Sequence, residues 1–141
     1  MNPEKYHLEK IDSGVTRDIY EITGDNLPKN LSKFKNRRDV IVKFARKDRY
    51  YYTNKAEFNV WRKTRNKDLF CPVYKLLNRG QFLVMKRADT KNVTGKHVSE
   101  YIKKYNKKYV IDIKTDIKES NIGILNNKPV LIDYPLVNLN R

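Results

Sequence analysis

The sequence has almost none of the features that mark disulfide-rich or membrane-spanning proteins. Its 141 residues include one cysteine, Cys71, so no internal disulfide can form, and a buried structural thiol in a reducing compartment is expected. No apolar run approaches the ~20 residues that a membrane-spanning helix needs, and the first residues lead into no apolar segment of the secretory type. These absences predict a cytoplasmic protein without a membrane partner.

Acidic side chains are scarce relative to basic ones. The chain has 31 Lys and Arg against 16 Asp and Glu, which gives a net charge of +15. Residues 28–108 carry 24 basic and 6 acidic groups, a net charge of +18. A field of this sign favours an acidic protein surface, nucleic acid or a nucleotide triphosphate as the partner, and it does not choose among them.

The apolar content of 39% is sufficient for a folded core. Alternating and contiguous apolar residues predict strands at residues 6–11, 17–23, 40–45, 73–77, 81–85, 122–125 and 129–132. Helices are expected from a cap at Thr53 or Asn54 to about Asn66, and over residues 96–108. Residues 24–39 show little periodicity and are expected to form a long exposed loop.

Three short turns separate these strands in pairs. Asp12-Ser13-Gly14, Asn78-Arg79-Gly80 and Asn126-Asn127-Lys128 hold residues that accept left-handed or tightly turned backbone. Each turn therefore predicts a β-hairpin. The last hairpin delivers Asp133 just past its second strand.

Four polar residues of the last third follow one another in an informative order. Asp116 precedes Asn121 by five positions, with Lys118 two positions after the aspartate. Asp133 lies 12 positions after Asn121. This order resembles the catalytic loop H-R-D-x-x-x-x-N of protein kinases followed by their metal-binding D-F-G. The resemblance spans about residues 6–135 and is strongest over 111–135.

The resemblance implies a role for each of these residues in Mg²⁺-dependent phosphoryl transfer from ATP. Asp133 would be the main metal ligand and Asn121 the second, because Mg²⁺ prefers a few oxygen ligands completed by waters and phosphates. Asp116 would orient or deprotonate the attacking hydroxyl. Lys118 would neutralise charge on the transferred group.

Upstream residues extend the resemblance to the nucleotide site. Lys43, within the predicted strand 40–45, resembles the kinase strand lysine that holds the nucleotide phosphates, and Glu57 on the following helix resembles its ion-pair partner. Met85 corresponds to the gatekeeper, and the backbone around Arg87 corresponds to the hinge that addresses adenine. Gly14 stands in the turn that corresponds to the Gly-rich phosphate loop.

The fold implied is α+β and protein-kinase-like: an N-terminal antiparallel sheet with one helix over residues 1–88, then a minimal C-terminal lobe over 89–141. This sequence departs from the family in several places. Gly14 is the one glycine of its turn, Lys114-Thr115 replaces His-Arg, and Asp133 is followed by Tyr-Pro. Six residues follow Pro135, so no activation segment or peptide platform is expected.

Three functions fit these observations. The first is a miniature ATP- and Mg²⁺-dependent kinase acting on Ser/Thr of a protein that docks on the basic surface. The second is a catalytically idle kinase-like protein that binds and inhibits or redirects an acidic protein partner. The third is nucleic-acid binding, through basic stretches interleaved with tyrosines at residues 46–52 and 103–109. A reduced lobe would also expose apolar surface that a homo-oligomer could bury.

Overall fold

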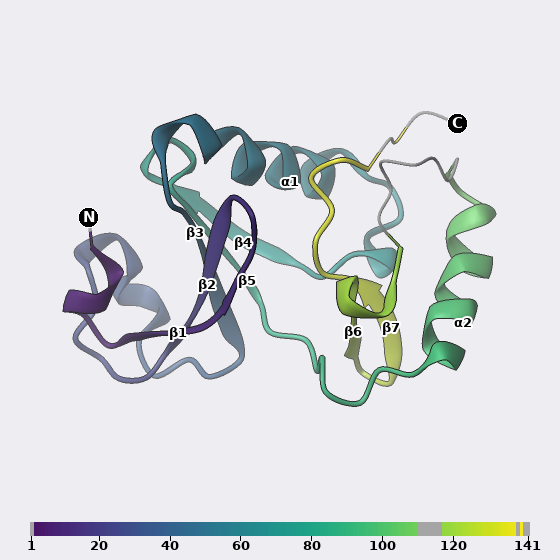
Figure 1. The fold of residues 1–141 in the computed structure, drawn as a ribbon, viewed down its shortest axis with the longest axis horizontal. Coiled ribbons are helices and arrows are strands. Elements are labelled where there is room, and N and C mark those ends of the chain that lie inside the picture. Colours follow the sequence, from purple (N-terminus) through teal and green to yellow (C-terminus); the bar gives the residue numbers. More distant parts are fainter. Residues whose placement is uncertain (1, 110–116, 138, 140–141) are drawn as a thin grey trace. The chain divides into compact units, whose positions relative to one another are not determined.

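A computed structural model describes residues 2–109, 117–137 and 139 of the chain. The strands are β1 (Leu8–Ser13), β2 (Arg17–Ile22), β3 (Val40–Ala45), β4 (Val73–Leu77), β5 (Phe82–Lys86), β6 (Ile122–Leu125) and β7 (Lys128–Leu131), and the α-helices are α1 (Tyr51–Lys63) and α2 (Gly95–Asn106). The predicted α+β class is confirmed (Figure 1). Within the described ranges, no helix combines the length and apolarity needed to cross a bilayer.

The chain forms two compact units. The first comprises Met1–Lys55 and Val73–Arg87, and the second comprises Ala56–Pro72 and Ala88–Arg141. Helix α1 contributes its first residues to the first unit and the rest to the second.

The first unit is built on a five-stranded antiparallel sheet with strand order β1-β2-β3-β5-β4. All predicted strands are present, with ends within two residues of those expected. Strand β3 matches its predicted bounds because its apolar run, interrupted by Lys43 alone, lies at the centre of the sheet. Tyr20, Val42 and Val84 lie in the buried core cluster on one face of the sheet.

The expectation of an exposed loop over residues 24–39 is wrong in its middle. Residues Lys29–Phe34 form a 3₁₀ helix, in which Leu31 is fully buried and Phe34 is 5% exposed. A 3₁₀ helix has three residues per turn, so these two side chains lie on the same face and enter the core of the sheet.

The predicted start and end of the first α-helix are also wrong. Helix α1 begins at Tyr51, directly after the 3₁₀ turn Asp48–Tyr50, and ends at Lys63. Asn54 is not a cap but a buried residue whose side-chain amide donates to the carbonyl of Gly80 at 2.8 Å. The same amide lies 3.2 Å from the carbonyl of Lys43, and its oxygen accepts a bond from Arg17 at 3.0 Å.

Two of the predicted hairpin turns show the expected left-handed backbone. Asn126 and Asn127 have φ of 51° and 65° between β6 and β7. Between β4 and β5, Gly80 has φ of 109°, and a Cβ atom there would lie 2.8 Å from the carbonyl oxygen of Tyr51. Only glycine fits at that position without strain.

The second unit joins α2 to the β6–β7 hairpin, seen side by side in green and yellow in Figure 1. Tyr101, Tyr105 and Leu131 are fully buried in it. Cys71 is buried as predicted, and its amide donates to the carbonyl of Leu131 at 2.9 Å. The hydroxyl of Tyr134 donates to the carbonyl of Cys71 at 2.7 Å.

Candidate functional site

The β6–β7 hairpin places the two predicted metal ligands at one of its ends. Ile122 at the start of β6 pairs with Leu131 at the end of β7, so Asn121 and Asp133 both lie just outside the same end. The amide of Ile132 donates to the carbonyl of Asn121 at 2.9 Å and fixes the two segments to each other. Asp133 is exposed and Asn121 is half-buried. One carboxylate and one amide oxygen are a donor set that suits Mg²⁺ completed by phosphate oxygens and waters.

A larger protein-only metal site is not seen in the described ranges, where no three or more His, Cys, Asp and Glu side chains come together.

Lys118 is joined to this end of the hairpin through the 3₁₀ turn Glu119–Asn121. The amide of Asn121 donates to the carbonyl of Lys118 at 2.9 Å, and the lysine side chain is exposed. The structure therefore brings Lys118, Asn121 and Asp133 to neighbouring backbone positions. The predicted catalytic residue Asp116 lies outside the described residues.

Glu57 on α1 holds the peptide that follows Asp133. Its side chain is fully buried, and its Oε1 atom accepts a hydrogen bond of 2.7 Å from the amide of Tyr134. The ring of Tyr134 packs edge-on against Phe70 at a centroid distance of 4.9 Å. Because both the amide and the ring of Tyr134 are fixed, the orientation of the neighbouring Asp133 backbone is restricted. This contact of Glu57 is one that the sequence did not predict.

Lys43 lies on β3 in the first unit and is 2% exposed. It stands opposite Ile19 on β2 and Leu83 on β5. A buried ammonium group is stable only when anionic or polar groups pair with it.

Met85 and Arg87 lie at the end of β5, where the resemblance places the gatekeeper and the hinge. Met85 is fully buried opposite Ile41 of β3. The amide of Arg87 donates to the carbonyl of Asp39 at 2.7 Å, and its guanidinium forms a 2.6 Å ion pair with Glu21. The backbone amide and the guanidinium of Arg87 thus both have partners within the first unit.

The β1–β2 turn around Gly14 is closed by its own hydrogen bonds. The amide of Gly14 donates to the carbonyl of Arg17 at 2.8 Å, and the hydroxyl of Ser13 donates to Asp18 at 2.6 Å. A Cβ atom on Gly14 would meet nothing closer than 3.5 Å. Val15 at the tip is 87% exposed.

Arg46, just after β3, ties this turn together, and sequence reasoning missed it. Its guanidinium donates to Asp18 at 2.9 Å, to the hydroxyl of Ser13 at 3.1 Å and to the carbonyl of Val15. Although burial alone would raise the pKa of Asp18, the hydrogen bonds from Ser13 and Arg46, together with the positive charges of Lys10 and Arg46, lower that pKa below its usual value. The signal that could have found Arg46 is the antiparallel pairing of β2 and β3. This pairing puts Ala45 opposite Arg17 and so brings Arg46 beside the turn.

Comparison with known proteins bears on the fold. No protein-family model and no curated protein matches the sequence. The chain is similar to the solved structure of a ternary complex of streptomycin, ATP and APH(2")-IIa. The similarity covers 97% of this chain and 69% of the chain of that structure, with a TM-score of 0.53 and 14% sequence identity. The fold is protein-kinase-like. At this identity the similarity concerns the fold alone.

Proposed function

We propose that this kinase-like chain is a small ATP- and Mg²⁺-dependent phosphotransferase that acts on a Ser or Thr hydroxyl of an acidic protein partner. The observation that carries the proposal is the position of Asn121 and Asp133 at one end of the β6–β7 hairpin, joined by the bond from Ile132 to the Asn121 carbonyl. The neighbour of similar fold was solved with ATP, which supports a nucleotide as the donor.

The side chains of the site divide the work of such a reaction. Mg²⁺, when bound, would neutralise charge between the phosphate groups. Asp133 and Asn121 would hold it through their oxygens, and Glu57 would keep Asp133 in place by fixing the Tyr134 amide. Lys43 would bind the phosphates that remain on the nucleotide, and Met85 would line the adenine site.

The transfer step would depend on Asp116 and Lys118. A carboxylate oxygen of Asp116 would accept the proton of the acceptor hydroxyl as the oxygen attacks the γ-phosphorus, while the bond between the γ-phosphorus and the β–γ bridging oxygen breaks and ADP leaves. The exposed ammonium of Lys118 would offset the charge that builds up on the transferred group. Positioning and electrostatics, rather than a covalent intermediate, would supply the rate enhancement.

The acidic partner is proposed from charge. Residues 28–108 carry a net charge of +18, and a basic surface raises both the association rate and the specificity for acidic proteins. A protein partner would also supply the acceptor hydroxyl that the kinase-like site needs.

Transfer of label from γ-labelled ATP tests this function. Wild type with Mg²⁺ should phosphorylate itself or an acidic Ser-containing protein such as casein, and Asp133→Ala should reduce the rate by about 10³-fold or more. Asp25→Ala makes the same change at an exposed carboxylate of the first unit that has no proposed role in the reaction, and it should retain the wild-type rate. Equal incorporation of label by Asp133→Ala and wild type would contradict the proposal.

The closed β1–β2 turn favours a second function, a catalytically idle kinase-like protein that binds an acidic partner. The amide of Gly14 already donates to the carbonyl of Arg17, and the side chain of Arg46 bonds to the carbonyl of Val15 within the turn. The turn therefore has little backbone left to bind a phosphate group. In that case wild type and Asp133→Ala would incorporate label equally little, while both would bind polyglutamate with the same affinity.

A further inference from the structure

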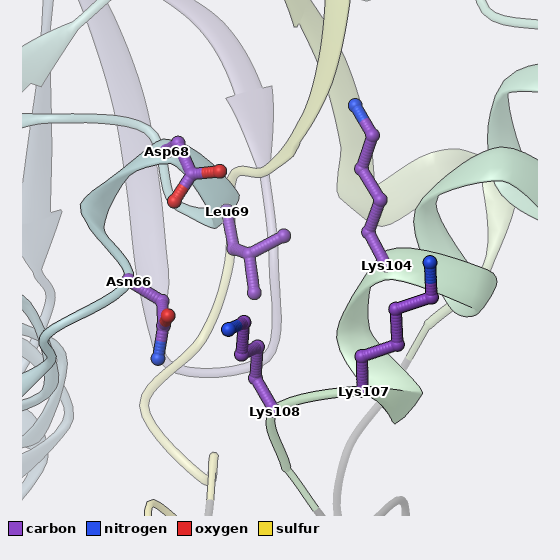
Figure 2. A pocket seen from close by; sticks show the side chains of 6 residues that line it. All are labelled: Asn66, Asp68, Leu69, Lys104, Lys107 and Lys108. Atoms are coloured by element: carbon purple, nitrogen blue, oxygen red, sulfur yellow. The ribbon is translucent and has the colours of Figure 1, made fainter.

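A pocket in the second unit is lined by none of the residues of the proposed site. It has a volume of about 220 Å³ and lies between the segment that follows α1 and the C-terminal end of α2. Figure 2 shows Asn66, Asp68 and Leu69 on one side, Lys104 and Lys107 on the other, and Lys108 reaching between them. Its size is below that of drug-sized ligand sites, so it suits a single small chemical group.

The walls of the pocket are held by buried tyrosines. The hydroxyl of Tyr109 accepts a 2.8 Å bond from the side chain of Asn66 and lies 2.5 Å from the hydroxyl of Thr64. The hydroxyl of Tyr101 donates to the carbonyl of Leu69 at 2.8 Å. Burial raises the pKa of Tyr101, so this hydroxyl stays protonated and remains a donor. These bonds pin the segment after α1 to the end of α2 and keep the pocket in shape.

The charge of the pocket lining is one-sided. The lining holds three lysines and one carboxylate, that of Asp68, which gives it a net charge of +2. Lys104 also lies 3.5 Å from Glu100, but both side chains are more than a third exposed, and such a surface pair is weak enough to be exchanged.

Lysines at a helix C-terminus often serve only to offset the helix dipole. That explanation covers Lys104, in the last turn of α2, better than the two lysines that follow the helix. The Tyr105 carbonyl at this end already accepts bonds of 2.9 Å from the amides of Lys108 and Tyr109. The ammonium groups of Lys107 and Lys108 are therefore not needed to satisfy it.

We propose that this pocket binds a phosphate monoester. Such a group carries close to two negative charges at neutral pH and three strong acceptor oxygens. It therefore matches both the net charge of the lining and the three ammonium donors. A carboxylate would supply one charge and two oxygens and would leave one lysine unpaired. The ester can belong to a phosphorylated protein side chain or to a free phosphorylated metabolite.

NMR titration of the full chain at constant ionic strength tests the proposal, with inorganic phosphate as the first probe. The amides of Leu69 and Lys108 should shift and saturate. In Lys107→Gln/Lys108→Gln the affinity should fall on the order of tenfold, whereas Lys103→Gln, on α2 but outside the pocket lining, should stay near wild type. Absence of saturable shifts, or an equal loss in Lys103→Gln, would overturn the proposal.

Further probes identify the source of the group and guard against a folding defect. A phosphoserine peptide that binds more tightly than both inorganic phosphate and glucose 6-phosphate would assign the pocket to phosphoproteins, and the reverse order would assign it to metabolites. A glutamate peptide that binds as tightly as the phosphoserine peptide would overturn phosphate recognition.

Asp68→Asn removes the one carboxylate of the lining and should tighten phosphate binding severalfold, so unchanged or weaker binding would also count against the proposal. None of these measurements requires ATP or phosphoryl transfer, so the pocket and the proposed function fail independently.

Discussion

The β1–β2 turn and the open end of the β6–β7 hairpin are stabilised in different ways. The turn is held by side chains, above all the guanidinium of Arg46, which bonds to Ser13, Val15 and Asp18. The hairpin end is held mainly through backbone groups, with the Ile132 amide on Asn121 and the Tyr134 amide on Glu57. In a half-exposed side-chain cluster, the loss of one hydrogen bond lowers the stability only a little. A buried amide that loses its acceptor carries the full desolvation penalty. We therefore expect mutations at the hairpin end to have larger effects on stability.

Glu57→Ala should have the largest effect. It leaves the buried amide of Tyr134 without its acceptor and creates a cavity, so the free energy of unfolding should fall by about 2–4 kcal/mol. Urea denaturation followed by circular dichroism measures this change. Glu57→Gln keeps an oxygen acceptor at nearly the same volume and should lose less. If Glu57→Ala unfolds at the same urea concentration as wild type, the hairpin end does not depend on this contact.

The glycines of two turns within the first unit provide the next comparison. At Gly80 the positive φ and the 2.8 Å approach to Tyr51 should make Gly80→Ala destabilising by about 1–3 kcal/mol. Gly14→Ala adds the same methyl group where nothing lies closer than 3.5 Å, and it should change stability little. Thermal denaturation of both variants makes the test. Equal losses would show that the β1–β2 turn also needs glycine.

Arg46→Gln should loosen the β1–β2 turn. Loss of the charge-assisted bonds to Asp18 and Ser13 should lower the free energy of unfolding by about 1–2 kcal/mol. Arg49→Gln is the control, because the described contacts of Arg49 are with the side chain of its half-buried neighbour Tyr50. Amide hydrogen exchange at Val15 and Arg17 should rise in Arg46→Gln alone. Unchanged exchange there would mean that the strands, and not Arg46, order the turn.

The pH dependence of stability should show the smallest effect. The pKa of Asp18 is lower in the folded protein than its ordinary value of 3.8, so the carboxylate stabilises the fold above that value. This contribution should disappear as the pH falls below about 4 and through the folded pKa. Asp18→Asn should lack this part of the acid-induced loss. Parallel urea curves at about pH 5 and pH 3 compare the two proteins, and identical losses would exclude a role for the Asp18 carboxylate.

The parts of the fold that the sequence predicted correctly depend on local patterns. Strand β3 is an apolar run interrupted by Lys43 alone, and the Asn126-Asn127 pair adopts the left-handed turn that asparagine tolerates. The hairpin that follows from this turn is enough to bring Asn121 and Asp133 to one end.

The parts that were missed depend on tertiary partners. Asn54 resembles a helix cap in the sequence, but it is buried, with partners on β2, β3 and the β4–β5 turn. Leu31 and Phe34 are buried because a 3₁₀ helix carries them to the sheet. The role of Arg46 requires the register of β2 and β3, which a basic stretch in the sequence does not reveal.

Calorimetric titration of ATP, with and without Mg²⁺, tests the account of the hairpin end most directly. Wild type should bind ATP more tightly with Mg²⁺, and Asp133→Ala should lose that enhancement while retaining the Mg²⁺-independent affinity. Asp25→Ala should behave as wild type. An ATP affinity of wild type that is the same with and without Mg²⁺, or an enhancement that survives in Asp133→Ala, would contradict the assignment of Asn121 and Asp133 as the metal-binding pair.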